Sequence, residues 1–431
     1  MLAFSGLFLL CAPIGAQAPA PRDAQTRLLD RRVLAFFEGM DRSPERAPAE
    51  LAALVGRHPS PLLDALSALQ PGGPTPFAAP PAGGDGTEAI LLAALERVPG
   101  QAVTPLIDAR IAAGPVLSEL FALCKALERC SDAATVPRAI ALAEAAGAQL
   151  ADERMQDVFE DALAAALVHP AEVHCLRRSW EDLPEEALAA AVRALAVARD
   201  PAALELATER LALDPDLTPE LLSAIGTLGA LGEPRARLAA ADAVLWHLRR
   251  CQSPTEIQAV VVCLDRLGDD CAVPELLPLL ESADEGVRRT VWRALCRLTG
   301  LGYPPEREPW EAWFGEEERW FDARAPELFA ALDSPRLEEA VAAIQEISAH
   351  RLHREALVEV LAHALSDERR DVRLQACIAH QRLKRRSSLP WLEELRTDPD
   401  AVVSQAADRA VRAIKGVGQR GPGHSLGSAR E

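Results

Sequence analysis

The chain has few aromatic residues and few of the residues that favour β-strands. Aromatic residues make up 4% of its 431 residues, and Tyr303 is the single tyrosine. This composition leaves little material for a β-sheet, whereas the abundant Ala and Leu favour helices. The length exceeds what one compact core ordinarily fills, so we expect several domains or one extended helical array.

Positive charge is also scarce. The formal net charge is −18, and lysine occurs at three positions, Lys125, Lys384 and Lys415. A strongly acidic chain is repelled by phosphate backbones and by anionic membrane surfaces. The composition therefore argues against nucleic acid as a partner and against membrane insertion of the mature chain.

Arrangements typical of catalysis are missing as well. No Ser-His-Asp arrangement can be assigned, and Gly226, Gly229 and Gly232 follow a predicted helix, whereas a dinucleotide loop follows a strand. We interpret these glycines as a helix C-terminus with a glycine cap. The sequence predicts no catalytic residue, no cofactor and no enzymatic activity.

Histidine clusters do not predict a metal site. His169 and His174, next to Cys175, are separated by Pro170 and do not share one helix face. A second group, His350 and His353, is interleaved with Arg351 and Arg354, which would repel a cation. Metal binding needs three or four converging ligands, and neither group supplies them.

The N-terminus resembles a secretory signal peptide. A short apolar run is followed by Pro13 and by small residues, with cleavage expected after Ala16 or Ala18. The run is too short to span a bilayer. We therefore expect residues 1–18 to be removed and the protein to be exported to the periplasm. No basic residue precedes the run, and a buried N-terminal helix is the alternative.

Eight cysteines follow the predicted cleavage site: Cys124, Cys130, Cys175, Cys251, Cys263, Cys271, Cys296 and Cys377. An even number in an exported chain would permit disulfides. Most lie among Leu, Val and Ala at helical spacing, where a free thiol packs as a small hydrophobic residue. Pairing of Cys251, Cys263 or Cys271 between neighbouring helices stays open.

Composition shifts divide the mature chain into five segments. Residues 19–69 predict N-terminal helices, and residues 70–86, rich in Pro and Gly, predict a linker. Irregular helical repeats are expected over 87–199 and regular repeats over 200–415. The Gly-rich end, 416–431, predicts a disordered tail.

A helical phrase recurs in the last third of the chain. Asp284–Leu295 returns as Arg370–Ala379 and again as Asp400–Val411, each with charge at its start and small or apolar residues at helical spacing. Leu267 and Leu298 are 31 residues apart, as are Leu383 and Ile414. Such spacing is typical of stacked helix pairs that form a solenoid.

Two stretches carry a family resemblance. Val273–Leu298 and Leu389–Ile414 resemble HEAT repeats, including the short lyase-like subtype. The resemblance implies an all-α, right-handed solenoid of helix pairs, here with an irregular N-terminal half. It also implies a non-enzymatic scaffold that binds a protein of unknown identity in an unknown oligomeric state. The alternatives are an accessory factor or enzyme of the lyase-like type, some of which serve pigment attachment, and a purely structural spacer.

An insert at 299–321 interrupts the repeats and resembles a Leu-Thr-Gly … Trp-x-x-Trp insertion of exported HEAT-repeat proteins from certain bacteria. Trp310 and Trp313 are three residues apart and share a helix face. Their rings either dock on the neighbouring repeat or form an aromatic binding patch.

Candidate binding residues come from three places: the second helices of the pairs, the insert at 299–321 and a dense basic group. The second helices of the pairs would line a concave face, and a dense basic group after the second copy of the phrase would suit an acidic partner surface. The alternative for that group is a solvated helix C-terminus. The candidates are Arg288, Trp292, Trp310, Trp313, Arg373, Arg382, Lys384, Arg385 and Arg386.

Overall fold

The computed structural model describes residues 31–33, 35–37, 46–69, 86–129, 134–198, 200–229 and 232–417. Within these ranges the chain forms α-helices and short 3₁₀ helices and no strand, so the predicted all-α architecture of stacked helix pairs is confirmed. The predicted signal peptide, Cys130, all but the last residue of the linker and the tail beyond residue 417 lie outside the described residues.

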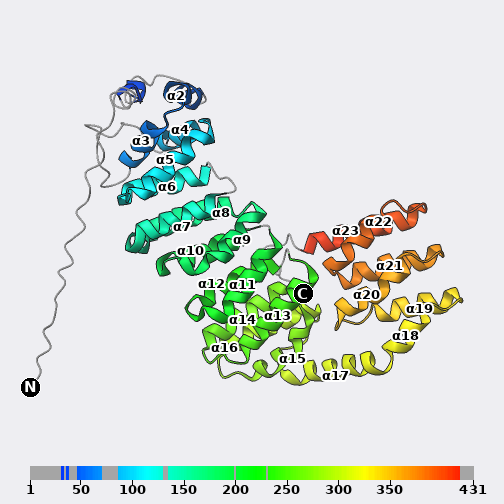
Figure 1. Cartoon of the computed structure of the whole chain (residues 1–431). Helices are drawn as coiled ribbons and strands as arrows, with labels where there is room; N and C mark the ends of the chain where they lie inside the picture. Colours follow the sequence, from blue (N-terminus) through cyan, green and yellow to red (C-terminus); the bar gives the residue numbers. More distant parts are fainter. Residues whose placement is uncertain are drawn as a thin grey trace, which may run out of the picture. The chain divides into compact units, whose positions relative to one another are not determined.

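The chain divides into two compact units, at residues 1–130 and 131–431. The first unit contains α2 (Ala47–Val55), α3 (Ser60–Ala68), α4 (Gly86–Leu95), α5 (Gly100–Ala112) and α6 (Leu117–Arg129) (Figure 1). Arg110 joins three of these helices, because its guanidinium pairs with Asp64 at 3.0 Å and with Glu119 at 2.6 Å. Among the described helices, none is by itself long and apolar enough to cross a bilayer; α4 and α5 would qualify only together, with a 111° bend between them.

The second unit begins with helices in two layers. One layer contains α7 (Thr135–Ala146), α9 (Pro170–Arg178), α11 (Pro201–Leu213) and α13 (Pro234–Leu248). The other contains α8 (Glu153–Ala166), α10 (Glu185–Leu195), α12 (Thr218–Gly229), α14 (Pro254–Leu267) and α16 (Glu285–Thr299). Each helix packs on the next member of its layer, which is the arrangement of a solenoid.

Local sequence sets the limits of these helices. Asp284 precedes α16, and its carboxylate accepts the backbone N–H of Val287 at 2.8 Å, which satisfies a donor that has no partner within the helix. Gly300 ends α16 with φ of 75°, a left-handed conformation that costs other residues free energy. The same device ends α14 at Gly268.

The three glycines lie at the C-terminal end of α12, where the sequence predicted a helix C-terminus. Gly229 is the last residue of the helix, and the backbone N–H of Gly232 donates to the carbonyl of Leu228 at 2.9 Å. Gly226 and Gly229 also allow α12 and α14 to approach closely, because a Cβ at Gly229 would come within 2.1 Å of the Leu267 side chain on α14.

A long helix follows the first stack. The predicted insert forms an extended connection and then α17 (Arg307–Ala323), a helix of 17 residues that packs against η5 (Leu277–Glu281) at one end and leads to α18 (Figure 1). A second stack continues from there, with a shared apolar core. Its helices are α18 (Ala325–Ala331), α19 (Leu337–Ile347), α20 (Arg354–Leu365), α21 (Arg370–Leu383), α22 (Leu389–Leu395) and α23 (Ala401–Val417).

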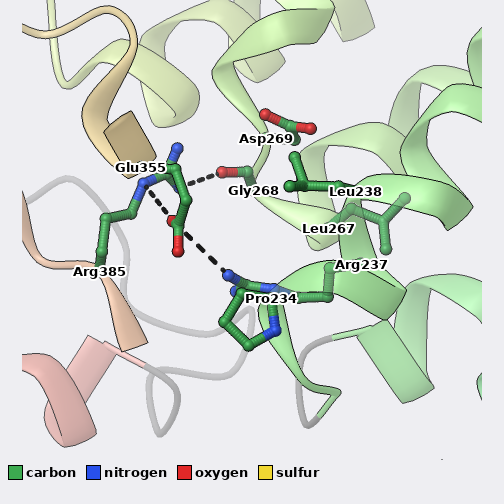
Figure 2. A pocket seen from close by; sticks show the side chains of 8 residues that line it. All are labelled: Pro234, Arg237, Leu238, Leu267, Gly268, Asp269, Glu355 and Arg385. Atoms are coloured by element: carbon green, nitrogen blue, oxygen red, sulfur yellow. Dashed lines mark hydrogen bonds and ion pairs between the residues drawn. The ribbon is translucent and has the colours of Figure 1, made fainter. Parts of the chain in front are cut away.

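Buried charges join the second stack back to the first. Arg385, just after α21, donates to the carboxylate of Asp270 and to the backbone carbonyl of Gly268, about 115 residues earlier in the chain. The backbone N–H of Arg354, at the start of α20, donates to the other oxygen of Asp270 at 2.8 Å. Glu355 lies 3.4 Å from Arg385 and 3.8 Å from Arg237 on α13 (Figure 2).

The closure cluster, as we call Arg237, Asp269, Asp270, Arg354, Glu355 and Arg385, contains three acidic and three basic side chains. The side chains of Asp270 and Arg385 are 2% and 8% exposed. Burial lowers the pKa of Arg385 to about 10, a cost that the neighbouring carboxylate of Asp269 opposes. Buried charges of this kind are tolerated because they are paired, and they specify how the two stacks meet.

The recurrent phrase uses one arginine in the same way in both stacks. Nη1 of Arg288 donates to the carbonyls of Ser282 and Ala283, six and five residues earlier, at 2.7 and 3.0 Å. Nη1 of Arg373 donates to the carbonyls of Asp367 and Glu368, at the same offsets, at 2.9 and 3.0 Å. The repeat thus preserves an arginine that satisfies the carbonyls of the preceding turn.

We expect Asp270→Ala to destabilise the second unit by about 3–5 kcal/mol, because Arg385 stays buried and loses the carboxylate that it bonds directly, keeping only the longer contact with Glu355 at 3.4 Å. The measurement is urea denaturation of the full chain followed by circular dichroism. Arg412→Ala, which removes an exposed pair with Asp408, is the control and should cost at most about 1 kcal/mol. Equal losses in the two variants would refute a structural role for the cluster.

Arg373→Lys should cost about 1.5–3 kcal/mol, because a lysine cannot bond both the Asp398 carboxylate and the two carbonyls as the guanidinium does. Arg370→Lys is the matched control, since Arg370 pairs with Asp400 while half exposed. Thermal unfolding of both variants tests this expectation, which fails if the two melting temperatures agree.

Candidate protein-binding site

A groove of about 560 Å³ lies between η5, the first turns of α16 and the start of α17. It forms where the insert leaves the regular stack, so the connection to α17 supplies one wall. It is lined by Leu280, Glu281, Glu285, Arg288, Arg289, Trp292, Pro305, Glu306 and Arg307. We call it the Trp292 groove.

Trp292 is the aromatic side chain of the groove. It is half-buried on α16, one helical turn after Arg288, so both side chains point to the same side of the helix. Its indole N–H donates to the carbonyl of Tyr303 at 2.8 Å, which orients the ring against the connection to α17. The sequence-based prediction had placed both residues on a binding face, and the structure brings them together in one groove.

The groove carries charges of both signs. Its lining contains three glutamates and three arginines. Arg307 pairs with Glu281 at 2.7 Å, and Arg289 pairs with Glu285 at 2.5 Å. Arg307 donates side-chain hydrogen bonds to Glu281 and Glu311, which raise the pKa of its guanidinium. Exposed pairs of this kind contribute little to stability, so a partner's charges could replace them at low cost.

Trp310 and Trp313 lie in the core instead of on the surface. Trp310 is fully buried, and Trp313 is 8% exposed. The two rings meet edge to face with centroids 6.2 Å apart, and the indole N–H of Trp310 donates to the carbonyl of Pro304 at 2.7 Å. The prediction of a binding patch here was wrong, and the alternative, that both rings seal a core, describes the structure.

The predicted basic group is divided among different roles. Arg385 is buried in the closure cluster, so its assignment to a binding surface was wrong. Lys384 caps α21 in a left-handed conformation with φ of 53° and is exposed. Arg382 is exposed and contacts Ser348 Oγ at 3.3 Å, and Arg386 is half-buried. The four residues do not form one basic patch.

Arg373 also has a structural task. Its guanidinium bonds Asp398 through two nitrogens, at 2.8 and 3.1 Å, in addition to the two carbonyls described above. Each of these bonds is charge-assisted, and together they engage N–H groups on Nε, Nη1 and Nη2 that a partner would need for hydrogen bonds. Arg373 therefore lies outside the candidate site.

One cluster of polar side chains was not predicted from the sequence. His247, Cys251 and Glu256 place one ligand atom each within 4.8 Å of the others. His247 lies in the last turn of α13, Cys251 in the loop that follows, and Glu256 in the first turn of α14. Cys251 and Glu256 are four and nine residues after His247, and the three converge because α13 and α14 fold back on each other. The short turn before Pro254 was the one sign of this in the sequence.

Comparison with known proteins gives a family for part of the second stack. Residues 325–412 match the family model of HEAT repeats. No curated protein matches the chain.

Solved structures show weak likenesses. Kap121p bound to RanGTP is 13% identical with a TM-score of 0.39, and Kap121p bound to Nup53p is 12% identical with a TM-score of 0.38. Each match covers 92% of this chain and 45% or 46% of Kap121p, so the chain spans a little less than half of that protein. Human deoxyhypusine hydroxylase in complex with glycerol is 21% identical with a TM-score of 0.23, over 61% of this chain and 98% of that one.

At these TM-scores the likenesses say nothing about the partners of this chain. The family match instead agrees with what the structure shows directly over the same residues, which are paired helices stacked on a continuous apolar core. The second stack, over residues 325–412, is composed of HEAT repeats.

Proposed function

We propose that the protein is a non-enzymatic scaffold that binds a segment of another protein in the Trp292 groove. The observation that carries this proposal is the groove itself, which combines an accessible tryptophan with arginines at a break in the helical stack. Tryptophan and arginine are the side chains most enriched at the energetic centres of protein interfaces.

The groove's lining favours a peptide segment over a small apolar ligand. Small-molecule sites are mostly apolar with a few polar groups, whereas six of the nine residues here are charged. A segment with an apolar anchor between acidic and basic residues would place the anchor on Trp292. Its charges would replace the pairs that Arg289 and Arg307 make within the chain.

The same proposal includes export from the cytoplasm, based on the sequence of residues 1–18. Three of the seven thiols in the described part of the chain are buried, which suits an oxidising compartment. Burial raises the pKa of Cys124, Cys263 and Cys377 to about 12 in each case. A thiol that stays protonated reacts slowly, because the thiolate is the nucleophile.

Site-specific cross-linking tests the groove. With a photo-reactive amino acid at position 289, the mature chain should cross-link a discrete partner in native cell extract, because this position lines the groove. The same amino acid at position 412, an exposed site on α23, is the control. Adding Trp292→Ala should reduce the cross-link at 289 by at least about tenfold, as loss of an interface anchor does. Equal yields at both positions, or no effect of Trp292→Ala, would rule out the groove as the binding site.

N-terminal sequencing of the protein from its own cells tests export. The expected result is a chain that begins after Ala16 or Ala18 and is recovered in the periplasmic fraction, since small residues precede a signal-peptidase site. A chain that keeps residues 1–16 and fractionates with the cytoplasm would refute this part of the proposal and leave the groove untouched.

A further inference from the structure

A cluster of three potential metal ligands lies at the turn between α13 and α14. His247 is in the last turn of α13, Cys251 follows the end of that helix, and Glu256 is in the first turn of α14. Nε2 of His247 lies 2.9 Å from Oε1 of Glu256, and the Cys251 sulfur completes a set whose atoms all lie within 4.8 Å of one another.

The backbone holds these side chains in place. In the metal-free chain the Cys251 thiol donates to the carbonyl of His247 at 3.4 Å, which places the sulfur over the end of α13. This hydrogen bond is lost when the thiol gives up its proton to bind a metal. The two helices pack against each other directly after the turn, so the ligands come from elements that are already fixed. The side chains of His247 and Glu256 are 16% and 34% exposed, which leaves a path for an ion to enter.

Nearby cations do not oppose an ion at this position. The guanidinium of Arg249 is 2.6 Å from Glu275, and that of Arg250 lies over the Trp246 ring at 4.0 Å from its centroid. Both arginines are therefore neutralised or directed elsewhere. A divalent cation between the Cys251 sulfur and the Glu256 carboxylate would favour the thiolate, because it screens one negative group from the other.

We propose that His247, Cys251 and Glu256 bind a zinc ion and leave its fourth position open. A nitrogen, a sulfur and a carboxylate oxygen form the donor set that zinc accepts, at about 2.0–2.3 Å from each. Tetrahedral ligands at those lengths are about 3.3–3.8 Å apart, so small side-chain rotations close the observed set. Thiolate and carboxylate together balance the charge of the ion, and the thiol proton passes to solvent on binding.

A pocket beside the cluster supplies room for a further ligand. His247 also lines an apolar pocket of about 250 Å³, together with Trp246, Leu211 and Ala243. Trp246 is 49% exposed at the pocket, a large exposed area for this side chain. A three-ligand zinc ion beside a pocket is typical of sites that hold water or a ligand in the fourth position, whereas structural zinc sites are closed by four protein ligands.

Metal titration of the full mature chain without a histidine tag tests the proposal. After removal of metals with a chelator, the chain should bind one equivalent of Zn²⁺ in competition with a chromophoric chelator. Co²⁺ in its place should give a thiolate-to-cobalt charge-transfer band and the intense visible absorption of a tetrahedral ion.

Three variants locate the ion. Cys251→Ser should abolish the charge-transfer band, and His247→Gln and Glu256→Gln should each weaken zinc binding by more than about tenfold. Cys296→Ser, which removes a half-buried thiol from α16, is the matched control and should bind as the unchanged chain does. Circular dichroism of the metal-free variants confirms that each is folded.

The proposal is overturned if the chain binds no zinc, or if binding persists unchanged in Cys251→Ser. The zinc proposal is independent of the Trp292 groove. The cross-linking experiment changes residues of α16, whereas the zinc ligands lie on α13, on α14 and in the turn between them.

Discussion

The ion pair between Arg385 and Asp270 is the interaction on which the second unit's architecture depends. Helix pairs in a solenoid contact their neighbours, and nothing in that arrangement requires residue 385 to meet residue 270. Here α17 carries the chain away from the first stack, and the closure cluster joins α20 and Arg385 after α21 back to the first turn of α13 and the residues after α14. Figure 2 shows Arg237, Glu355 and Arg385 of this cluster. Removing one partner would leave a buried charge with fewer carboxylate contacts, so substitutions at this contact should be costly.

The Trp292 groove is a consequence of the same break in the stack. Within the stack, each second helix is covered by the next one, as α14 is by α16. At α16 no regular pair follows, and the extended connection covers part of the helix while α17 begins beyond it. Trp310 and Trp313 are buried in the core, whereas Trp292, which bonds the same connection at Tyr303, remains half-buried. Trp292 thus presents an aromatic surface because α17, the next long helix, does not cover it.

Repeat spacing and residue type allowed the all-α stack of helix pairs to be predicted. Asp284 and Gly300 mark the ends of α16 through chemistry that acts within one turn, and the recurrence of Asp284–Leu295 predicted that neighbouring pairs would stack. The prediction of functional residues was less successful, because Arg288 and Arg373 recur for the carbonyls that they satisfy. A recurrent arginine therefore signals the repeat, and Arg288 differs from Arg373 in that it also lines a groove.

By itself, the sequence determined the helices, their pairing and the acidic surface, since propensity, capping and periodicity act over a few residues. Tertiary structure alone decided the rest. In the sequence, nothing distinguishes Arg385 from its basic neighbours Lys384 and Arg386, whereas in the structure it is paired with Asp270. His247, Cys251 and Glu256 converge because α13 folds back on α14. Burial and proximity depend on distant segments, and they separate a charge that holds the stacks together from one that is free to bind.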